Sequence, residues 1–213
     1  MTPVRDGYLQ VAATAAELLA DPAVAAAWDE PSALERYRVS GLAGHLAGQL
    51  FFIARVLDAP VPVEPPIALL DYYTRIPWLT AGPDDAVHVR IRTGSVQAAA
   101  DGPDALSARA AATVERLRTA LPAAPADRTV RLDPWGPWSL RLDDFVTSRM
   151  IELVVHCDDL AVSVGRPTPP VPGPVVDTVI DVLSRLAVHR HGATAVLRAF
   201  SRAERAPATI AAF

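Results

Sequence analysis

Two residue types that bind metal ions well, glutamate and histidine, are four positions apart in an apolar segment of this chain. The segment reads FVTSRMIELVVHCDDL from Phe145 to Leu160 and contains Glu152 and His156. Residues four apart on a helix lie on one face, one turn from each other. Because a buried ionised carboxylate is costly unless it is paired or bound to a metal, the pair is a candidate half of a metal site.

A third ligand is expected from a second helix, where His45 lies in the segment GLAGHLAG. Gly44 and Gly48 surround this histidine, although each glycine weakens a helix by about 1 kcal/mol relative to alanine. Small residues of this kind let another helix or a ligand approach closely. Two imidazoles and one carboxylate leave at least one coordination position open. This is the ligand set of a catalytic Zn2+, and Ni2+, Co2+ or Fe2+ would also fit.

Each part of this site also has a plainer interpretation. A glutamate and a histidine four apart often form a surface pair, and a lone histidine is more often a core residue than a ligand. Both segments are apolar and both are predicted to be helical. The sequence leaves two interpretations open, metal binding and these plainer roles.

Arg149 and Asp159 are the other candidate functional residues, and both can face the side of the ligands. Asp159 is three residues after His156 and could orient that ligand through a hydrogen bond. Asp158 competes for this role, and an exposed acid at the helix end is the alternative. Arg149, three residues before Glu152, could bind an anionic substrate or pair with that glutamate.

Several further residues are weaker candidates for the same pocket. Gln49, four residues after His45, could line it, whereas His88 has no partner at ligand spacing. Cys157 is interpreted as a buried small hydrophobe rather than a nucleophile. The aromatic residues that could wall the pocket mouth, or instead anchor the core and loops, are Tyr72, Tyr73, Trp78, Trp135 and Trp138.

The elements that must position these residues are mostly helices. Apolar spacing, with Gly and Pro as punctuation, predicts helices over residues 6–28 with a break at Pro22, 41–57, 67–75, 83–100, 103–121, 144–164, 175–189 and 194–200. Ser40 is expected to cap the second of them.

Alternating residues on both sides of the turn DPWGP predict a small β-hairpin over residues 129–142. The fold class is therefore all-α, a four-helix bundle with a small β-hairpin and a short helical C-terminal tail. The bundle is expected over residues 1–165. A proline-rich linker and a helical extension packed on the bundle are expected over residues 166–213.

The composition narrows the function classes. The chain has 213 residues, and its formal net charge of −4 argues against nucleic-acid binding. No apolar run approaches the length of a membrane span, and MTPVRDGYLQ has no signal pattern. A single cysteine excludes an intramolecular disulfide, and the absence of lysine excludes Schiff-base chemistry. We expect a cytoplasmic monomer or homodimer with no nucleic-acid or membrane partner, and a composition rich in alanine and arginine hints at an actinobacterial source.

The segments GHLAG at His45 and RMIELVVHCDDLAVSVG at Glu152 and His156 resemble the mycothiol-dependent maleylpyruvate isomerase family, within the wider DinB-like metal-binding superfamily. The resemblance extends from about residue 8 to residue 165. It implies a four-helix bundle in which these three residues hold a divalent metal, usually zinc. It also implies that mycothiol, a low-molecular-weight thiol, serves as cosubstrate in isomerisation or transfer.

The tail departs from this family pattern. Full-length members have a C-terminal α/β domain that supplies an arginine for the thiol. Here the tail from Val171 is expected to be short and helical, and Arg198, Arg202 and Arg205 have no assigned role.

The expected function is that of a metal-dependent, mycothiol-dependent isomerase or thiol transferase acting on a small molecule such as an unsaturated acid. The alternative is a noncatalytic DinB-like protein that binds a metal or senses a ligand. A transcription-factor bundle is disfavoured because no basic helix-turn-helix is evident.

Protons should compete with the metal if both histidines are ligands. An unperturbed histidine has a pKa near ~6.5. The sequence therefore predicts a metal affinity that is flat above about pH 7 and falls below about pH 6, by more than one proton per metal.

Overall fold

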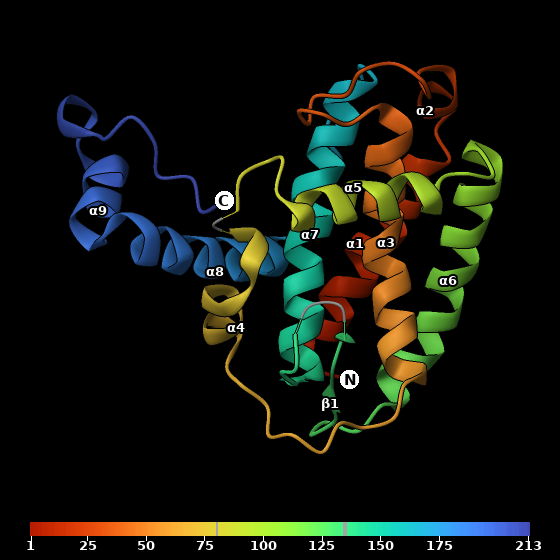
Figure 1. Cartoon of the computed structure of the whole chain (residues 1–213), viewed down its shortest axis with the longest axis horizontal. Helices are drawn as coiled ribbons and strands as arrows, with labels where there is room; N and C mark the ends of the chain where they lie inside the picture. Colours follow the sequence, from red (N-terminus) through yellow and green to blue (C-terminus); the bar gives the residue numbers. More distant parts are fainter. Residues whose placement is uncertain (80, 134–135) are drawn as a thin grey trace.

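Helices dominate the computed structural model of the chain, which describes residues 1–79, 81–133 and 136–213 (Figure 1). Their buried apolar side chains fill one continuous core. This architecture confirms the predicted all-α bundle. The four long helices that pack together are α1 (Pro3–Leu19), α3 (Val39–Asp58), α6 (Pro103–Ala123) and α7 (Leu142–Ser163).

The other helices surround this bundle. Figure 1 shows α5 crossing in front of it, and α5 packs mainly against α3. The C-terminal helix α8 leaves the bundle sideways and contacts α1, α4 and α7, while α9 packs on α8. The expected division at residue 165 stays a prediction. The bounds of these helices are α2 (Pro22–Ala26), α4 (Leu69–Arg75), α5 (Ala86–Ala98), α8 (Gly173–His191) and α9 (Ala193–Ser201), with 3-10 turns at Pro77–Leu79 and Ala203–Arg205.

The predicted break at Pro22 is a complete interruption. Asp21 accepts a hydrogen bond from the Ala23 amide at 2.8 Å and starts α2 as a separate helix, with Pro22 at its first position.

After the C-terminus of α7, Gly165 adopts a left-handed φ of 66°. This conformation lets the Arg166 amide donate to the Ala161 carbonyl at 2.9 Å, which ends the helix as expected.

The start of α3 differs from its prediction. The helix begins at Val39, and Ser40 does not cap it. The Val39 amide donates to the Glu30 carbonyl at 3.0 Å, and the Ser40 amide donates to the Trp28 carbonyl at 2.9 Å. The backbone of the preceding loop therefore satisfies these amides, and no side-chain cap is needed.

The predicted hairpin is present but short. Strands β1 (Thr129–Val130) and β2 (Leu140–Arg141) pair antiparallel, with Val130 opposite Leu140. Pro134 and Trp135, in the predicted turn, lie outside the described residues.

One buried and one partly buried arginine close the ends of two bundle helices. Arg5 on α1 forms an ion pair with Asp143 at 2.6 Å and donates to three carbonyl groups at and just after the end of α6. Arg128 donates to three carbonyl groups at and after the end of α3. The last carbonyls of a helix have no partner within it, so these guanidinium groups satisfy them.

Helix α3 is long and apolar enough to cross a membrane by length and composition alone. About two thirds of its most apolar window, 67%, is buried inside the bundle, as in a core helix. One helix of this kind is weak support for a membrane span. The sequence of α3 is not a continuous apolar run of that length, because glycines, His45 and Gln49 interrupt it.

Candidate metal centre

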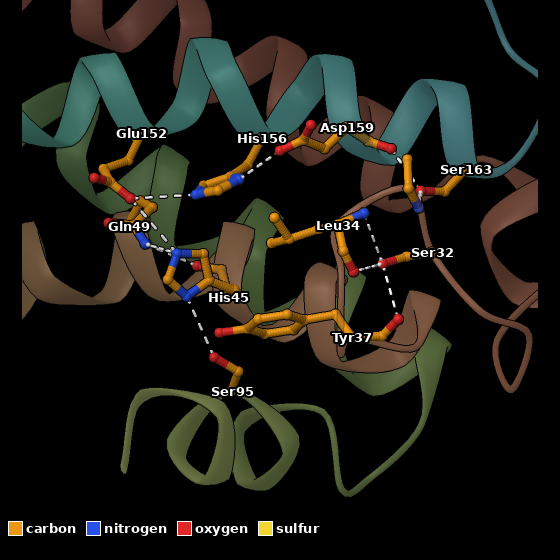
Figure 2. A network of polar contacts seen from close by, with 11 residues as sticks. Ser32, Leu34, Tyr37, His45, Gln49, Ser95, Glu152, His156, Asp159 and Ser163 are labelled. Atoms are coloured by element: carbon orange, nitrogen blue, oxygen red, sulfur yellow. Dashed lines mark hydrogen bonds and ion pairs between the residues drawn. The ribbon is translucent and has the colours of Figure 1, made fainter. Parts of the chain in front are cut away.

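The structure brings His45, Glu152 and His156 together between α3 and α7, although they are far apart in the sequence. His45 Nε2 lies 3.5 Å from Glu152 Oε2, and His156 Nε2 lies 3.3 Å from the same oxygen (Figure 2). One donor atom from each residue lies within 4.8 Å of the other two. Ligand atoms about 2.0–2.1 Å from a tetrahedral ion stand about 3.3 Å apart, so this donor set fits a divalent metal.

A carboxylate orients the His156 ring. His156 Nδ1 lies 2.9 Å from Oδ2 of Asp159. Because a carboxylate only accepts, Nδ1 carries the proton and Nε2 faces the centre. This is the place that the sequence predicts for Asp159. The competing Asp158 instead accepts a hydrogen bond from Thr168 at the exposed end of α7.

A hydroxyl group orients the His45 ring. His45 Nδ1 lies 3.3 Å from Oγ of Ser95, and Ser95 donates its own hydrogen to the Ile91 carbonyl at 2.9 Å. Ser95 therefore accepts from Nδ1, and Nε2 of His45 faces Glu152. Ser95 could not be identified from the sequence, because it lies on α5 and has no spacing relation to the ligands.

Gly44 explains how α5 comes so close to the ligand helix. A Cβ atom at position 44 would lie 2.0 Å from the Ser95 carbonyl oxygen, a distance that no real contact permits. The expectation of a close approach is therefore met at this glycine. At Gly48 no other helix comes close among the described residues, because the nearest atom to a Cβ there is a Phe52 ring carbon at 3.8 Å, and this glycine instead lines a separate cavity.

Arg149 supports the centre from inside the core. It is 1% exposed, and its Nη1 donates to Oε1 of Gln49 at 2.8 Å. Gln49 in turn donates to the His45 carbonyl at 3.0 Å, so Arg149 is connected to the ligand helix. Its positive charge also lowers the pKa of Glu152. Of the two predicted roles, this placement favours electrostatic pairing with the glutamate over substrate binding.

The protonation of the metal-free site follows from these contacts. Although burial opposes it, the hydrogen bond from His156, together with the positive charge of Arg149, holds the pKa of Glu152 well below its usual range. Burial also opposes protonation of His156, but the carboxylates of Asp159 and Glu152 outweigh it and raise the pKa of His156 to about 9. Burial lowers the pKa of His45. At neutral pH the metal-free site thus pairs an imidazolium with a carboxylate.

A cavity of about 390 Å³ lies beside the three candidate ligands, and all three line it. Among the described residues, its other walls come from separate parts of the chain. They include Tyr37 of the loop before α3, His88, Ile91 and Arg92 of α5, and Arg190 and Phe213 of the C-terminal region.

The aromatic residues proposed for the pocket mouth lie elsewhere or are not described. Tyr72 and Tyr73 are buried at 4% and 0% exposure. Trp138 and Tyr72 line a small separate cavity beside the hairpin. The Trp78 side chain and Trp135 lie outside the described residues. These residues resemble Tyr37 and Phe213 in type, so type alone could not identify which aromatics reach the site.

Cys157 is a buried small side chain, as the sequence predicts. Its side chain is 4% exposed, and burial raises the pKa of the thiol to about 12. A thiol of this kind is protonated at neutral pH and is a poor nucleophile.

The unassigned arginines of the tail are exposed. Arg198 lies on α9, and Arg202 and Arg205 follow it. Arg190, near the end of α8, is the tail arginine that lines the cavity within the part of the chain that the structure describes.

Comparison with known proteins gives one match. The family model described as the mycothiol maleylpyruvate isomerase N-terminal domain matches residues 8–161. No curated protein and no solved structure matches the chain significantly. The matched range contains all three candidate ligands together with Ser95 and Asp159.

Proposed function

Because the chain belongs to the family of mycothiol maleylpyruvate isomerase N-terminal domains, we propose that it is a divalent-metal-dependent enzyme with a low-molecular-weight thiol, mycothiol, as cosubstrate. Its reaction is isomerisation or thiol transfer on a small organic substrate such as an unsaturated acid. One observation carries the proposal: His45, Glu152 and His156 converge at the wall of a cavity large enough for a small molecule.

The donor set selects the class of metal. Two imidazoles and a carboxylate suit Zn2+ best, and Ni2+, Co2+ or Fe2+ are compatible. A divalent ion held there supplies Lewis acidity and lowers the pKa of a thiol in the cavity. The protein contributes two imidazoles with fixed orientation, since Asp159 and Ser95 each hold the Nδ1 proton of one ring.

The cavity wall supports an anionic substrate. Arg92 and Arg190 both line it, and each guanidinium is charged at neutral pH. An acid in the cavity would meet these two cations in addition to the metal. This supports the choice of an unsaturated acid over a neutral molecule.

The alternative is a noncatalytic protein that binds a metal or senses a ligand. A structural metal site is closed by protein ligands, whereas a catalytic site keeps a position open. Three candidate ligands beside a cavity favour the enzyme.

Metal analysis tests the site. We expect about one ion per chain in the purified protein, and loss of that ion in both His45→Ala and Glu152→Ala. His189→Ala, which changes an exposed histidine on α8, is the matched control and should keep the metal. Full retention of metal in both site variants would exclude the site.

A turnover screen tests the reaction class. The metal-loaded protein is incubated with cis-unsaturated acids, with and without mycothiol, and isomer and thioether products are measured. We expect turnover that requires both the metal and the thiol. Binding of metal and acid with no thiol-dependent turnover would favour the noncatalytic alternative.

A further inference from the structure

The loop before α3 contains an unusual backbone conformation. Arg36 has a φ of 68°, and among the described residues it is the one non-glycine residue with a positive φ. A left-handed conformation is sterically unfavourable for a residue with a side chain. Such strain persists only where surrounding contacts hold it in place.

Those contacts are on both sides of Arg36. The Ser32 hydroxyl lies within hydrogen-bond distance of the Leu34 amide, at 3.2 Å, and of the Tyr37 carbonyl, at 2.9 Å. The Arg36 guanidinium forms an ion pair with Asp84, in the loop that leads to α5. The strained residue is therefore tied to its own loop and to the approach of α5.

The residue that this conformation places in the site is Tyr37. Its ring packs edge-on against the His45 ring, with the centroids 5.9 Å apart and the planes at 62°. Figure 2 shows its hydroxyl pointing toward Ser95 and the His45 ring. A phenol hydroxyl carries its hydrogen at neutral pH and can donate a hydrogen bond.

Ser95 has room for one more donor. A serine hydroxyl has one hydrogen and two acceptor positions. The hydrogen is donated to the Ile91 carbonyl at 2.9 Å, and one acceptor position takes the His45 Nδ1 proton at 3.3 Å. Because its hydrogen goes to the Ile91 carbonyl, Ser95 can only accept in its hydrogen bond with the Tyr37 hydroxyl, which points toward it in Figure 2. With all three positions used, the Ser95 side chain has no reason to rotate away from His45.

We propose that Tyr37 is a positioning residue of the metal centre, which acts through Ser95 to hold His45 with Nε2 directed at the metal position. The inference rests on the proposed function, since it requires His45 to be a ligand. It also accounts for the strained conformation of Arg36, because the turn at that residue places the Tyr37 phenol between the cavity and Ser95.

Zinc affinity in a double-mutant cycle tests this. The dissociation constant is measured by chelator competition for the full chain, Ser95→Ala, Tyr37→Phe and the double variant. Partners of a ligand histidine typically change metal affinity about 10–100-fold, so we expect that loss in Ser95→Ala and about a 3–10-fold loss in Tyr37→Phe. Because Tyr37 acts through Ser95, the double variant should bind zinc no more weakly than Ser95→Ala.

Tyr72→Phe is the matched control. It also removes a tyrosine hydroxyl, but Tyr72 lies on α4 and, among the described contacts, has no hydrogen bond or ring contact with Ser95 or His45, so zinc affinity should change much less than in Tyr37→Phe. Wild-type affinity in Tyr37→Phe would overturn the inference. So would a double variant whose loss equals the product of the two single losses, because Tyr37 would then act independently of Ser95.

A second readout reports on His45 directly and separates this inference from the proposed function. In the zinc-loaded protein labelled with nitrogen-15 histidine, the His45 Nδ1 proton should be protected from exchange. Protection should be lost in Ser95→Ala and reduced in Tyr37→Phe, and unchanged exchange in Tyr37→Phe would contradict the inference. If His45→Ala keeps its zinc, the proposed function fails. If His45→Ala loses zinc while Tyr37→Phe matches the wild type, only the role of Tyr37 fails.

Discussion

The distance between α3 and α5 at the metal centre depends on the missing side chain of Gly44. A methyl group at this position would lie 2.0 Å from the Ser95 carbonyl oxygen, which belongs to the rigid backbone of α5. The nearest atom to the equivalent position at Gly48 is a Phe52 ring carbon at 3.8 Å. The close approach of α5 therefore requires a glycine at position 44, whereas no comparable contact requires one at position 48.

We predict that Gly44→Ala and Gly48→Ala have opposite effects on stability. Gly44→Ala should lower the free energy of unfolding by about 1–3 kcal/mol, because α5 must move away, and should weaken zinc binding by displacing Ser95. Gly48→Ala should raise it by up to about 1 kcal/mol, because alanine favours the helix and meets no clash. Urea unfolding of both variants checks this. Equal effects would mean that the close approach at position 44 is wrong.

The candidate ligands could be predicted from the sequence, but two residues around them could not. Glu152, His156 and Asp159 share a helix, so their spacing alone places them on one face. His45 stood out because glycines surround it in an apolar helix. Ser95 and Tyr37 are brought to His45 only by the crossing of α5 and by the turn before α3. Their hydroxyl groups are common residue types, and no spacing within one element connects them to the ligands.

At the scale of elements, apolar periodicity predicted the helices well, and their ends less well. In α3, α6 and α7 the buried residues recur at three- and four-residue steps, as apolar periodicity predicts. The start of α3 was misplaced because the preceding loop supplies backbone acceptors, which no local sequence pattern reveals. The loop conformation at Arg36 was not predictable for the same reason.

The strain in this loop is measurable by comparing two substitutions at one position. Arg36→Ala and Arg36→Gly both remove the ion pair with Asp84, so the difference between them isolates the backbone. Glycine adopts a positive φ at no steric cost. We predict that Arg36→Gly is more stable than Arg36→Ala by about 1–2 kcal/mol in urea unfolding. Equal stabilities, or a more stable alanine variant, would mean that position 36 is not left-handed in solution.

Arg5 connects three bundle helices, because it lies on α1, pairs with Asp143 on α7 and caps the end of α6. We predict that Arg5→Met lowers the free energy of unfolding by about 3–5 kcal/mol, since it leaves a partly buried carboxylate and buried carbonyls without a donor. Arg118→Met removes an exposed arginine that pairs with Glu115, and should have little effect. Similar unfolding midpoints for the two variants would contradict this role for Arg5.

At the scale of the whole molecule, the metal site links the two central helices, since His45 lies on α3 and its two partners lie on α7. In the metal-free site the ion pair between His156 and Glu152 lies within α7 and stabilises the folded form of that helix. Bound zinc and the ion pair of the metal-free site both stabilise the fold. The ion pair requires a proton on His156, whereas zinc binding requires that this proton be released. The pH dependence of stability therefore distinguishes them.

The metal-free protein should lose stability as the pH rises above 6.5. The pKa of His156 is about 9 in the folded chain, against an ordinary value of 6.5. A raised pKa contributes stability that is complete below the unfolded value and disappears as the pH passes the folded value. We predict a loss of up to about 3 kcal/mol between pH 6.5 and 9. Below pH 6.5, the lowered pKa of His45 acts in the other direction, so stability should peak near this pH.

Metal should reverse this trend, because a ligand histidine must release its proton before it binds. Through the range from pH 6.5 to 9, zinc binding displaces one proton from His156, and the affinity keeps rising where the sequence alone predicted a plateau above about pH 7. Bound metal stabilises the fold by about 2.7 kcal/mol at a hundredfold excess over its dissociation constant, so this stabilisation should grow with pH. Urea unfolding with zinc and with a chelator, at several pH values from 6 to 9, measures the difference between the two states. A difference that stays constant above pH 7 would mean that His156 is already neutral in the metal-free protein, and that Asp159 and Glu152 do not raise its pKa.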